Sequence, residues 1–240
     1  KFENDHVLHN ELWLKGMHMF LRYIDDIFII WNGAKLALEL AIGDLNSKHS
    51  HIKFTHTISD VSISFLDVLV TRESCIFNTS LFQKLTDRNN TLHFSSFHPA
   101  SLKQHLPFSQ FLHIKRITSD AGRLQQSLDC YSKRFLARGY STDIVNSALT
   151  RAQLRSRSEL LVSRQKSEQT RLTVVSKFST QSGQIKKAIL KRWELLQSES
   201  DFGSLFQELP LFAYSRSRNI KDLLRKPRLP VNSVSRGTLK

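Results

Sequence analysis

The stretch Arg22-Tyr23-Ile24-Asp25-Asp26-Ile27-Phe28-Ile29-Ile30-Trp31 places two adjacent acids between two apolar segments. β-Branched and aromatic residues dominate both flanks, and such segments favour strands. The acids stand where the chain must turn, so the pattern predicts a β-hairpin over residues 18–31 with two carboxylates at its tip. Mg²⁺ prefers hard oxygen ligands and is commonly bound by one or two carboxylates together with substrate phosphates. Pairs of metal ions about 3.5–4 Å apart serve polymerases and nucleases in this way.

A solvated turn is the simpler interpretation of the two acids, because Asp is common in turns. Asp-Asp is not the Asn-Gly or Asp-Gly pair that two-residue hairpin loops prefer, however. Two adjacent like charges also repel each other, and a bound cation would remove that repulsion. The hairpin by itself therefore favours a metal site and leaves the plain turn as the alternative.

The segment 22–28 resembles the Tyr-x-Asp-Asp box of reverse transcriptases, in the form found in Penelope-like retroelements. Further blocks follow in that family's order, and the likeness runs from about Leu21 to Leu229. Leu85 stands where the family has Pro, which puts the rigidity of one turn in doubt. The later blocks are Phe65-Leu66-Asp67, residues 83–87, residues 92–99, Phe135 to Tyr140, and two connector-like segments at 210–214 and 219–224.

The resemblance implies an RNA-directed DNA polymerase of a retrotransposable element, of which this chain supplies the later palm, the thumb and a connector. Asp25 would be a catalytic metal ligand, and Asp26 a weaker ligand or an electrostatic support. Tyr23 and Ile24 would pack the hairpin against the primer end, and Asp67 would support the primer and the palm. The implied cofactor is Mg²⁺ or Mn²⁺, and the implied partner is an RNA template–DNA primer duplex.

Asp67 also has an interpretation that rests on its neighbours. It interrupts an apolar segment, 63–70, that is predicted to be a strand, and an unpaired charge there would be expensive to bury. We expect it to pair with an arginine or a backbone amide, and a contact with metal or substrate is the alternative.

Important parts of such a polymerase are missing from the sequence. The family uses a third metal-binding Asp on an earlier strand and fingers that close on the nucleotide, and the 24 residues before Asp25 contain no Asp on a predicted strand. We therefore expect the chain to be inactive as a polymerase by itself. A non-enzymatic nucleic-acid-binding remnant is the main alternative. A nuclease using Asp25, Asp26 and Asp67 is a weaker one.

The charge is unevenly distributed along the chain. The formal net charge is +14; residues 1–100 carry 9 Lys/Arg against 11 Asp/Glu, whereas residues 101–240 carry 26 against 10. A basic region of this kind favours a polyanion as partner. The cations expected to contact phosphates are Lys103, Lys115, Arg116, Arg123, Lys133, Arg134, Arg138, Arg151 and Arg155.

Other classes of protein receive no support. Cys75 and Cys130 form no Cys-x-x-Cys pair, which argues against a zinc site or a disulfide framework. No segment approaches the roughly 20 apolar residues of a membrane span, and residues 1–9 lack the apolar core of a signal peptide. We expect an intracellular protein, nuclear or cytoplasmic, without a membrane partner. The oligomeric state stays open.

Hydrophobic periodicity predicts an α+β domain over residues 1–88, an antiparallel sheet with a helix. The hairpin is followed by a helix at 34–47, a half-buried strand at 52–58, and strands at 63–70 and 76–82. In the polymerase interpretation this domain is the later part of a right-hand palm.

Residues 89–160 predict a three-helix unit of helix-turn-helix type, which the resemblance identifies as the thumb. The helices should begin at Ser101, Ser119-Asp120 and Ser141, with Gly139 ending the second and Pro107 splitting or kinking the first. Residues 161–240 should form a basic connector. It would contain a strand at 172–175, an amphipathic helix at 184–197 and a disordered tail from 228.

Overall fold

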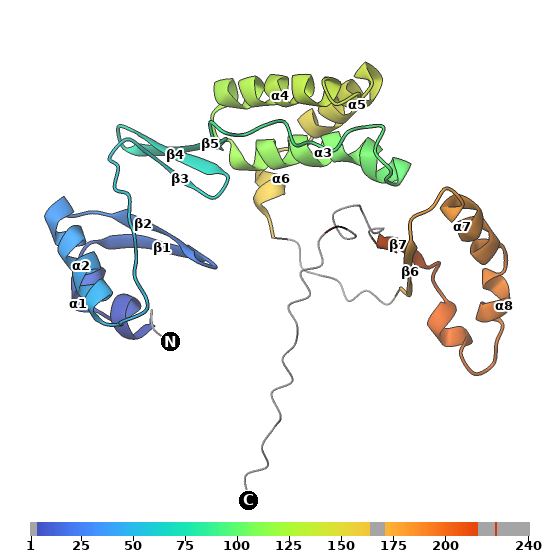
Figure 1. Cartoon of the computed structure of the whole chain (residues 1–240), viewed down its shortest axis with the longest axis horizontal. Coiled ribbons are helices and arrows are strands. Elements are labelled where there is room, and N and C mark those ends of the chain that lie inside the picture. The colour runs from blue at the N-terminus through green and yellow to red at the C-terminus, as the bar shows by residue number, and fades with distance from the viewer. Residues whose placement is uncertain (1–3, 164–170, 216–223, 225–240) are drawn as a thin grey trace, which may run out of the picture. The chain divides into compact units, whose positions relative to one another are not determined.

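The computed structural model of the chain describes residues 4–163, 171–215 and 224 (Figure 1). Contacts between residues divide the chain into two compact units, 1–163 and 164–240. Both units mix helices and small sheets. The class expected from the sequence, a chain of helices and strands with antiparallel pairing in its first part, is confirmed at this level.

The first module contains the predicted hairpin and helix. Strands β1 and β2 pair antiparallel, with Tyr23 opposite Asp26. One face of this two-stranded sheet, which includes Phe20 and Ile29, packs on a core around Trp13 and the buried side of α2. The elements are η1 (Asn4–Leu8), α1 (Glu11–Leu14), β1 (Met17–Tyr23), β2 (Asp26–Trp31) and α2 (Lys35–Ser47).

The strand predicted at 52–58 is wrong, because this segment pairs with no other strand in the described residues. Its backbone is bound by a side chain instead. Asn46 of α2 accepts from the Phe54 amide at 2.6 Å and donates to the Phe54 carbonyl at 3.0 Å. Phe54 and Ile58 then pack on the core of the first module. The alternation of apolar residues therefore reflects packing against α2.

A three-stranded antiparallel sheet follows, formed by β3 (Ser62–Phe65), β4 (Val68–Glu73) and β5 (Ile76–Leu81). The single strand predicted at 63–70 is wrong, because the chain reverses at Leu66-Asp67 and Phe65 pairs with Val68. Asp67 thus lies in a turn, and its charge is not buried inside a strand.

The three tight hairpins within residues 17–81 each use a two-residue loop whose first residue has a positive φ. These residues are Ile24 (φ 53°), Leu66 (φ 55°) and Ser74 (φ 56°). Left-handed geometry is unusual for a residue other than glycine and is strained for a β-branched one. The first of these turns is formed by Ile24 and Asp25, so Asp26 is already the first residue of β2.

Four helices complete the first unit: α3 (Ala100–Ile117), α4 (Ala121–Leu136), α5 (Thr142–Gln153) and the short α6 (Arg157–Leu161). Asp120 caps α4 by accepting from the Arg123 amide at 2.8 Å. Ser141 caps α5 through the Ile144 amide. Both N-termini agree with the sequence prediction.

Helix α3 differs from the prediction at two places. Pro99, rather than Ser101, precedes its first turn, and no side chain caps it. The helix is not split at Pro107, which is fully buried inside it. A proline removes one backbone hydrogen bond from a helix, and here the continuous helix coincides with full burial of the ring in the core.

The second unit contains a parallel pair of strands, β6 (Thr173–Lys177) and β7 (Leu211–Ser215). The amphipathic segment predicted as one helix is two, α7 (Ser182–Lys191) and α8 (Trp193–Gln197), followed by the 3-10 turn η2 (Gly203–Phe206). Trp193 is buried and donates from its indole to the Phe206 carbonyl at 3.0 Å. The tail expected from residue 228 lies outside the described residues, as does the segment 219–224 except Leu224.

Candidate nucleic-acid interface

Helices α4 and α5, with the tight turn between them, form a helix-turn-helix. Gly139 allows the turn by adopting a φ of 81°, which other residues rarely do. Tyr140 then returns the chain to the core, where its ring meets Phe135 edge to face at 5.1 Å between centroids. Phe111 of α3 also meets Phe135 edge to face, at 5.9 Å between centroids. These aromatic contacts fix the position of α5 relative to the other two helices.

The exposed side of α5 carries polar side chains, and the sequence prediction named only Arg151 among them. Val145, Ala148 and Ala152 are buried, so the helix has one inward side and one solvent side. Once the inward positions of the helix are identified in the sequence, the remaining positions are the ones expected to face solvent. That set is Thr142, Asp143, Asn146, Ser147, Thr150, Arg151 and Gln153.

Four of the nine predicted phosphate-binding cations are engaged within the protein. Lys103 donates to the carbonyls of Phe94 and Ser96, at 2.7 and 3.0 Å. Lys115 donates to the carbonyls at the end of α5, the nearer at 2.8 Å. Arg123 and Arg134 each form an ion pair with an acidic side chain of another segment, Glu73 and Asp87 respectively. These four side chains primarily hold the fold together.

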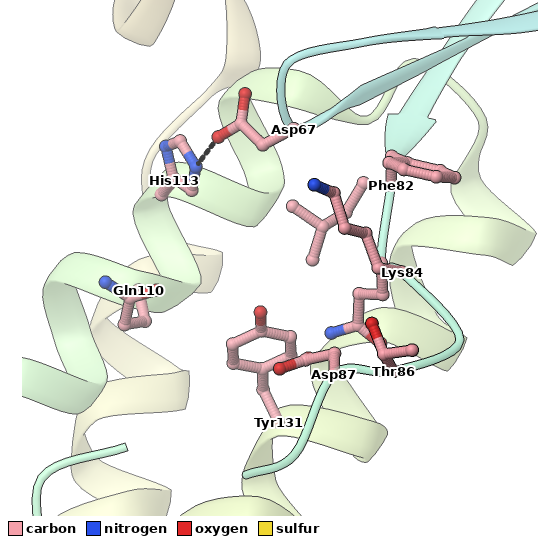
Figure 2. Close-up of a pocket in the computed structure, with 10 residues that line it drawn as sticks. Asp67, Phe82, Lys84, Thr86, Asp87, Gln110, His113 and Tyr131 are labelled. Carbon is pink, nitrogen blue, oxygen red and sulfur yellow. Dashed lines mark hydrogen bonds and ion pairs between the residues drawn. The ribbon is translucent and has the colours of Figure 1, made fainter. Parts of the chain in front are cut away.

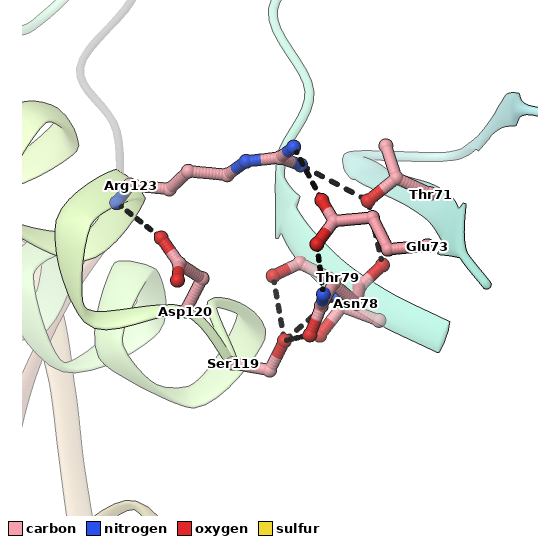
Figure 3. Close-up of polar contacts among 7 residues, drawn as sticks. All are labelled: Thr71, Glu73, Asn78, Thr79, Ser119, Asp120 and Arg123. Atoms are coloured by element: carbon pink, nitrogen blue, oxygen red, sulfur yellow. Dashed lines mark hydrogen bonds and ion pairs between the residues drawn. The ribbon is translucent and has the colours of Figure 1, made fainter. Parts of the chain in front are cut away.

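Arg123 belongs to a polar network that joins the β3–β5 sheet to the turn between α3 and α4 (Figure 3). It donates to the Thr71 hydroxyl at 3.0 Å and to the Glu73 carboxylate at 3.1 Å. In the same network Ser119 donates its amide to the Thr79 carbonyl at 2.8 Å, and its hydroxyl accepts from the Thr79 amide at 2.9 Å. The sheet is therefore fixed to the helices by several short contacts.

The remaining predicted cations are available to a ligand. Arg151 lies over the Phe108 ring, at 4.3 Å from its centroid, and stays exposed. The side chains of Arg116, Lys133, Arg138 and Arg155 have no hydrogen-bond or ion-pair partner among the described residues. Arg116 and Arg155 lie where α3 and α5 end, and Lys133 and Arg138 lie where α4 ends. Free positive charge is thus found at two ends of the helical unit.

The hairpin tip presents its two acids to solvent. Asp25 occupies the turn, and Asp26 shares a face with Tyr23, because residues opposite each other in a ladder point the same way. This face is the one turned away from α2, since Phe20 and Ile29 occupy the other. Neither carboxylate has a partner within the described residues, and Arg22 braces the turn by donating to the Ile24 carbonyl at 2.7 Å.

The donor set at this tip fits a metal ion only in part. Two adjacent, exposed carboxylates suit a single Mg²⁺ that keeps several waters and completes its shell with substrate oxygens. A site for two metals needs more acids, and the described residues contain no group of three or more His, Cys, Asp or Glu side chains placed to hold a metal. The tip therefore supplies part of such a site.

Asp67, expected to pair with an arginine or a backbone amide, instead accepts from a histidine. His113 Nε2 of α3 lies 2.7 Å from its Oδ2 atom, and both side chains remain about half exposed. The backbone carbonyl of Asp67 accepts from the Phe82 amide at 2.8 Å. The residue thereby ties the β3–β4 turn to the helical unit, and Asp25 and Asp26 are not part of this contact.

Comparison with known proteins gives a match for the helical unit. Residues 90–150 match the family model described as an animal helix-turn-helix domain. The prediction of a helix-turn-helix unit in this part of the chain is therefore confirmed. No curated protein and no solved structure matches the chain. The helices described in the structure include none long and apolar enough to span a membrane.

Proposed function

We propose that the helical unit binds a nucleic-acid duplex, and that the chain serves as the late palm, thumb and connector portion of an RNA-directed DNA polymerase of a Penelope-like element. The helix-turn-helix match over residues 90–150, which includes α3, α4 and most of α5, carries the first part. In motifs of this type the second helix enters a groove. The order of sequence blocks that resemble the family supports the second part.

In this proposal the polar side of α5 faces a groove of the duplex. Asn146, Ser147 and Thr150 are short and uncharged, so they allow close approach and can donate to and accept from nucleic-acid atoms. The four free cations would contact phosphates, which fixes position without reading sequence. The two ends of the 16-residue helix α4 are separated by about 24 Å, enough for cations near them to reach separate parts of a backbone.

Duplex binding is tested by measuring affinity for a blunt RNA–DNA hybrid and for blunt double-stranded DNA over a range of salt concentrations. Each phosphate contact on B-DNA contributes about 0.9 to the slope of log K against log salt. Replacing Arg116, Lys133, Arg138 and Arg155 together by Gln should lower that slope substantially. Lys35→Gln removes a charge from α2 and is the matched control. A slope unchanged by the fourfold replacement would contradict the proposed interface.

The polymerase part is tested at the hairpin tip by a readout that needs no activity. Mn²⁺ should selectively broaden the NMR signals of residues around Asp25 and Asp26. Asp25→Asn together with Asp26→Asn should abolish the effect and leave duplex affinity unchanged. We expect no nucleotide incorporation by the chain alone, and incorporation in a primer-extension assay would overturn this expectation.

A non-enzymatic nucleic-acid-binding protein is the second candidate. The observation in its favour is that the described residues offer only two carboxylates at the tip, too few for a two-metal centre. If Mn²⁺ fails to broaden the hairpin signals while duplex binding is retained, this candidate replaces the polymerase proposal.

A further inference from the structure

An open pocket of about 390 Å³ lies between the segment that follows β5 and helices α3 and α4 (Figure 2). Its volume is in the range of sites that bind small organic ligands. The proposed duplex interface does not use it. The lining residues that bear polar groups are Asp67, Gln83, Lys84, Thr86, Asp87, Gln110, His113 and Tyr131.

Both acids of the pocket already have partners. Asp67 is bound by His113 Nε2 at 2.7 Å, and Asp87 is bound by Arg134 at 2.7 Å. The Asp87–Arg134 pair is well shielded, since the arginine side chain is 16% exposed. These pairs hold the walls of the pocket in place and leave the acids poorly suited to bind a cation.

Lys84 is the cation of the pocket that stays free. Its side-chain amine has no partner among the described residues, and Figure 2 shows it extending into the pocket on the side of Asp67. On the opposite wall the Tyr131 ring points its hydroxyl into the same space. Arg134 lies over this ring, 5.0 Å from its centroid, and so holds its plane. The pocket thus combines a free ammonium group with a fixed aromatic ring and neutral polar groups.

We propose that this pocket binds one nucleotide, with its phosphate on the Lys84 amine and its base against the Tyr131 ring. Single-stranded nucleic acid is bound by this pairing of a cation for the backbone with an aromatic ring for the base. Gln110 and Thr86 supply neutral donors for the sugar or base edge. As part of the proposed function, the nucleotide would be an unpaired one at the end of the duplex bound by the helical unit.

A mononucleotide titration tests the pocket independently of the duplex. Deoxyadenosine monophosphate added to the isotope-labelled full chain should shift the NMR signals of Lys84, Gln110 and Tyr131 and leave those of α5 unchanged. Inorganic phosphate and deoxyadenosine, added separately, should each produce smaller shifts. Shifts that are absent, or equally large on α5, would overturn the proposal.

A second experiment tests the pocket within the proposed function. It compares the affinity of the chain for a blunt duplex with its affinity for the same duplex carrying one unpaired nucleotide. Stacking of one base on an aromatic ring should tighten binding of the overhang duplex about fivefold or more. Lys84→Gln and Tyr131→Leu should remove this preference and retain affinity for the blunt duplex. Lys133→Gln, on the same helix as Tyr131 but outside the pocket, should weaken both duplexes equally.

The outcomes separate the two proposals. If the blunt duplex binds and the overhang gives no advantage, the pocket proposal is wrong and the duplex proposal stands. If neither duplex binds, the duplex proposal fails and the mononucleotide titration alone decides the pocket. Lys84 is exposed, and its side chain forms no hydrogen bond or ion pair with the described residues, so its replacement tests the pocket even if Tyr131→Leu destabilises the fold.

Discussion

Arg134 Nη2 donates to Asp87 Oδ2 at 2.7 Å, and this pair fastens the segment after β5 to helix α4. Because the arginine side chain is largely shielded from water, the contact should matter more than an ordinary surface ion pair. We expect Arg134→Gln to destabilise the protein by about 1.5–3 kcal/mol, the range of hydrogen bonds to charged groups. Chemical denaturation measures the change.

Lys133, the preceding residue, should behave in the opposite way. It is exposed and has no partner in the described region, so Lys133→Gln should leave the denaturation midpoint unchanged and weaken binding to a duplex. Anisotropy titrations at low and moderate salt provide the measurement. Equal effects of the two substitutions on stability would show that Lys133 also has a structural contact.

Glycine is required at one position and only tolerated at another. Gly139→Ala should destabilise the protein by about 1–2 kcal/mol, since the residue has a φ of 81° and alanine in left-handed geometry is strained. Gly43→Ala is the control. Its added methyl group meets nothing within 4 Å in the interior of α2, and alanine favours a helix over glycine by about 1 kcal/mol. Thermal melts should move in opposite directions.

Tyr140 should make stability depend on alkaline pH. Burial raises the pKa of its phenol above the usual value of 10.0. In the unfolded chain the phenol ionises first, so the folded state loses stability as the pH rises past about 10. Tyr140→Phe removes this contribution, and the difference between the melting curves of the two proteins at pH 8 and pH 10.5 isolates it.

The same substitution should be harmless or stabilising at neutral pH. The Tyr140 hydroxyl is buried and has no hydrogen-bond partner in the described structure. Removing an unsatisfied buried polar group relieves its desolvation penalty. A clear loss of stability at pH 7 would mean that the hydroxyl has a partner.

Ile24→Gly should stabilise the hairpin. Ile24 has a φ of 53° and an exposed side chain, so glycine relieves the strain and little packing is lost. A gain of about 1 kcal/mol would raise the melting temperature by about 2–4 °C for a chain of this size. Ile27→Gly, at a half-buried position in β2 with ordinary geometry, should lower it.

The elements predicted most reliably from sequence are those that depend on residues within the element itself and not on contacts with distant segments. The hairpin follows from its apolar flanks, and the starts of α4 and α5 follow from Asp120 and Ser141, whose caps act within one helical turn. The segment 52–58 was mispredicted because its partner is the Asn46 side chain, and alternation in a sequence does not distinguish that from a neighbouring strand. The turn at Leu66-Asp67 was hidden in an apolar run without glycine.

The roles of the cations could not be predicted for a related reason. Lys103 and Arg116 are equally basic in sequence, but only Lys103 meets carbonyls of a preceding segment, at Phe94 and Ser96. Contacts between distant segments decide which charges remain free for a ligand. The polar side of α5, in contrast, could have been identified from Val145, Ala148 and Ala152, the inward positions of the same helix.

The two-stranded β1–β2 sheet has consequences for handling the protein in the laboratory. Neither strand has a second neighbour in the described residues, and Met19, Leu21 and Tyr23 leave apolar area exposed on the face turned away from α2. Unpaired edges with apolar flanks promote self-association. Purified chain should therefore form oligomers as its concentration rises, and replacing Met19 and Leu21 with Lys and Glu should improve its solubility.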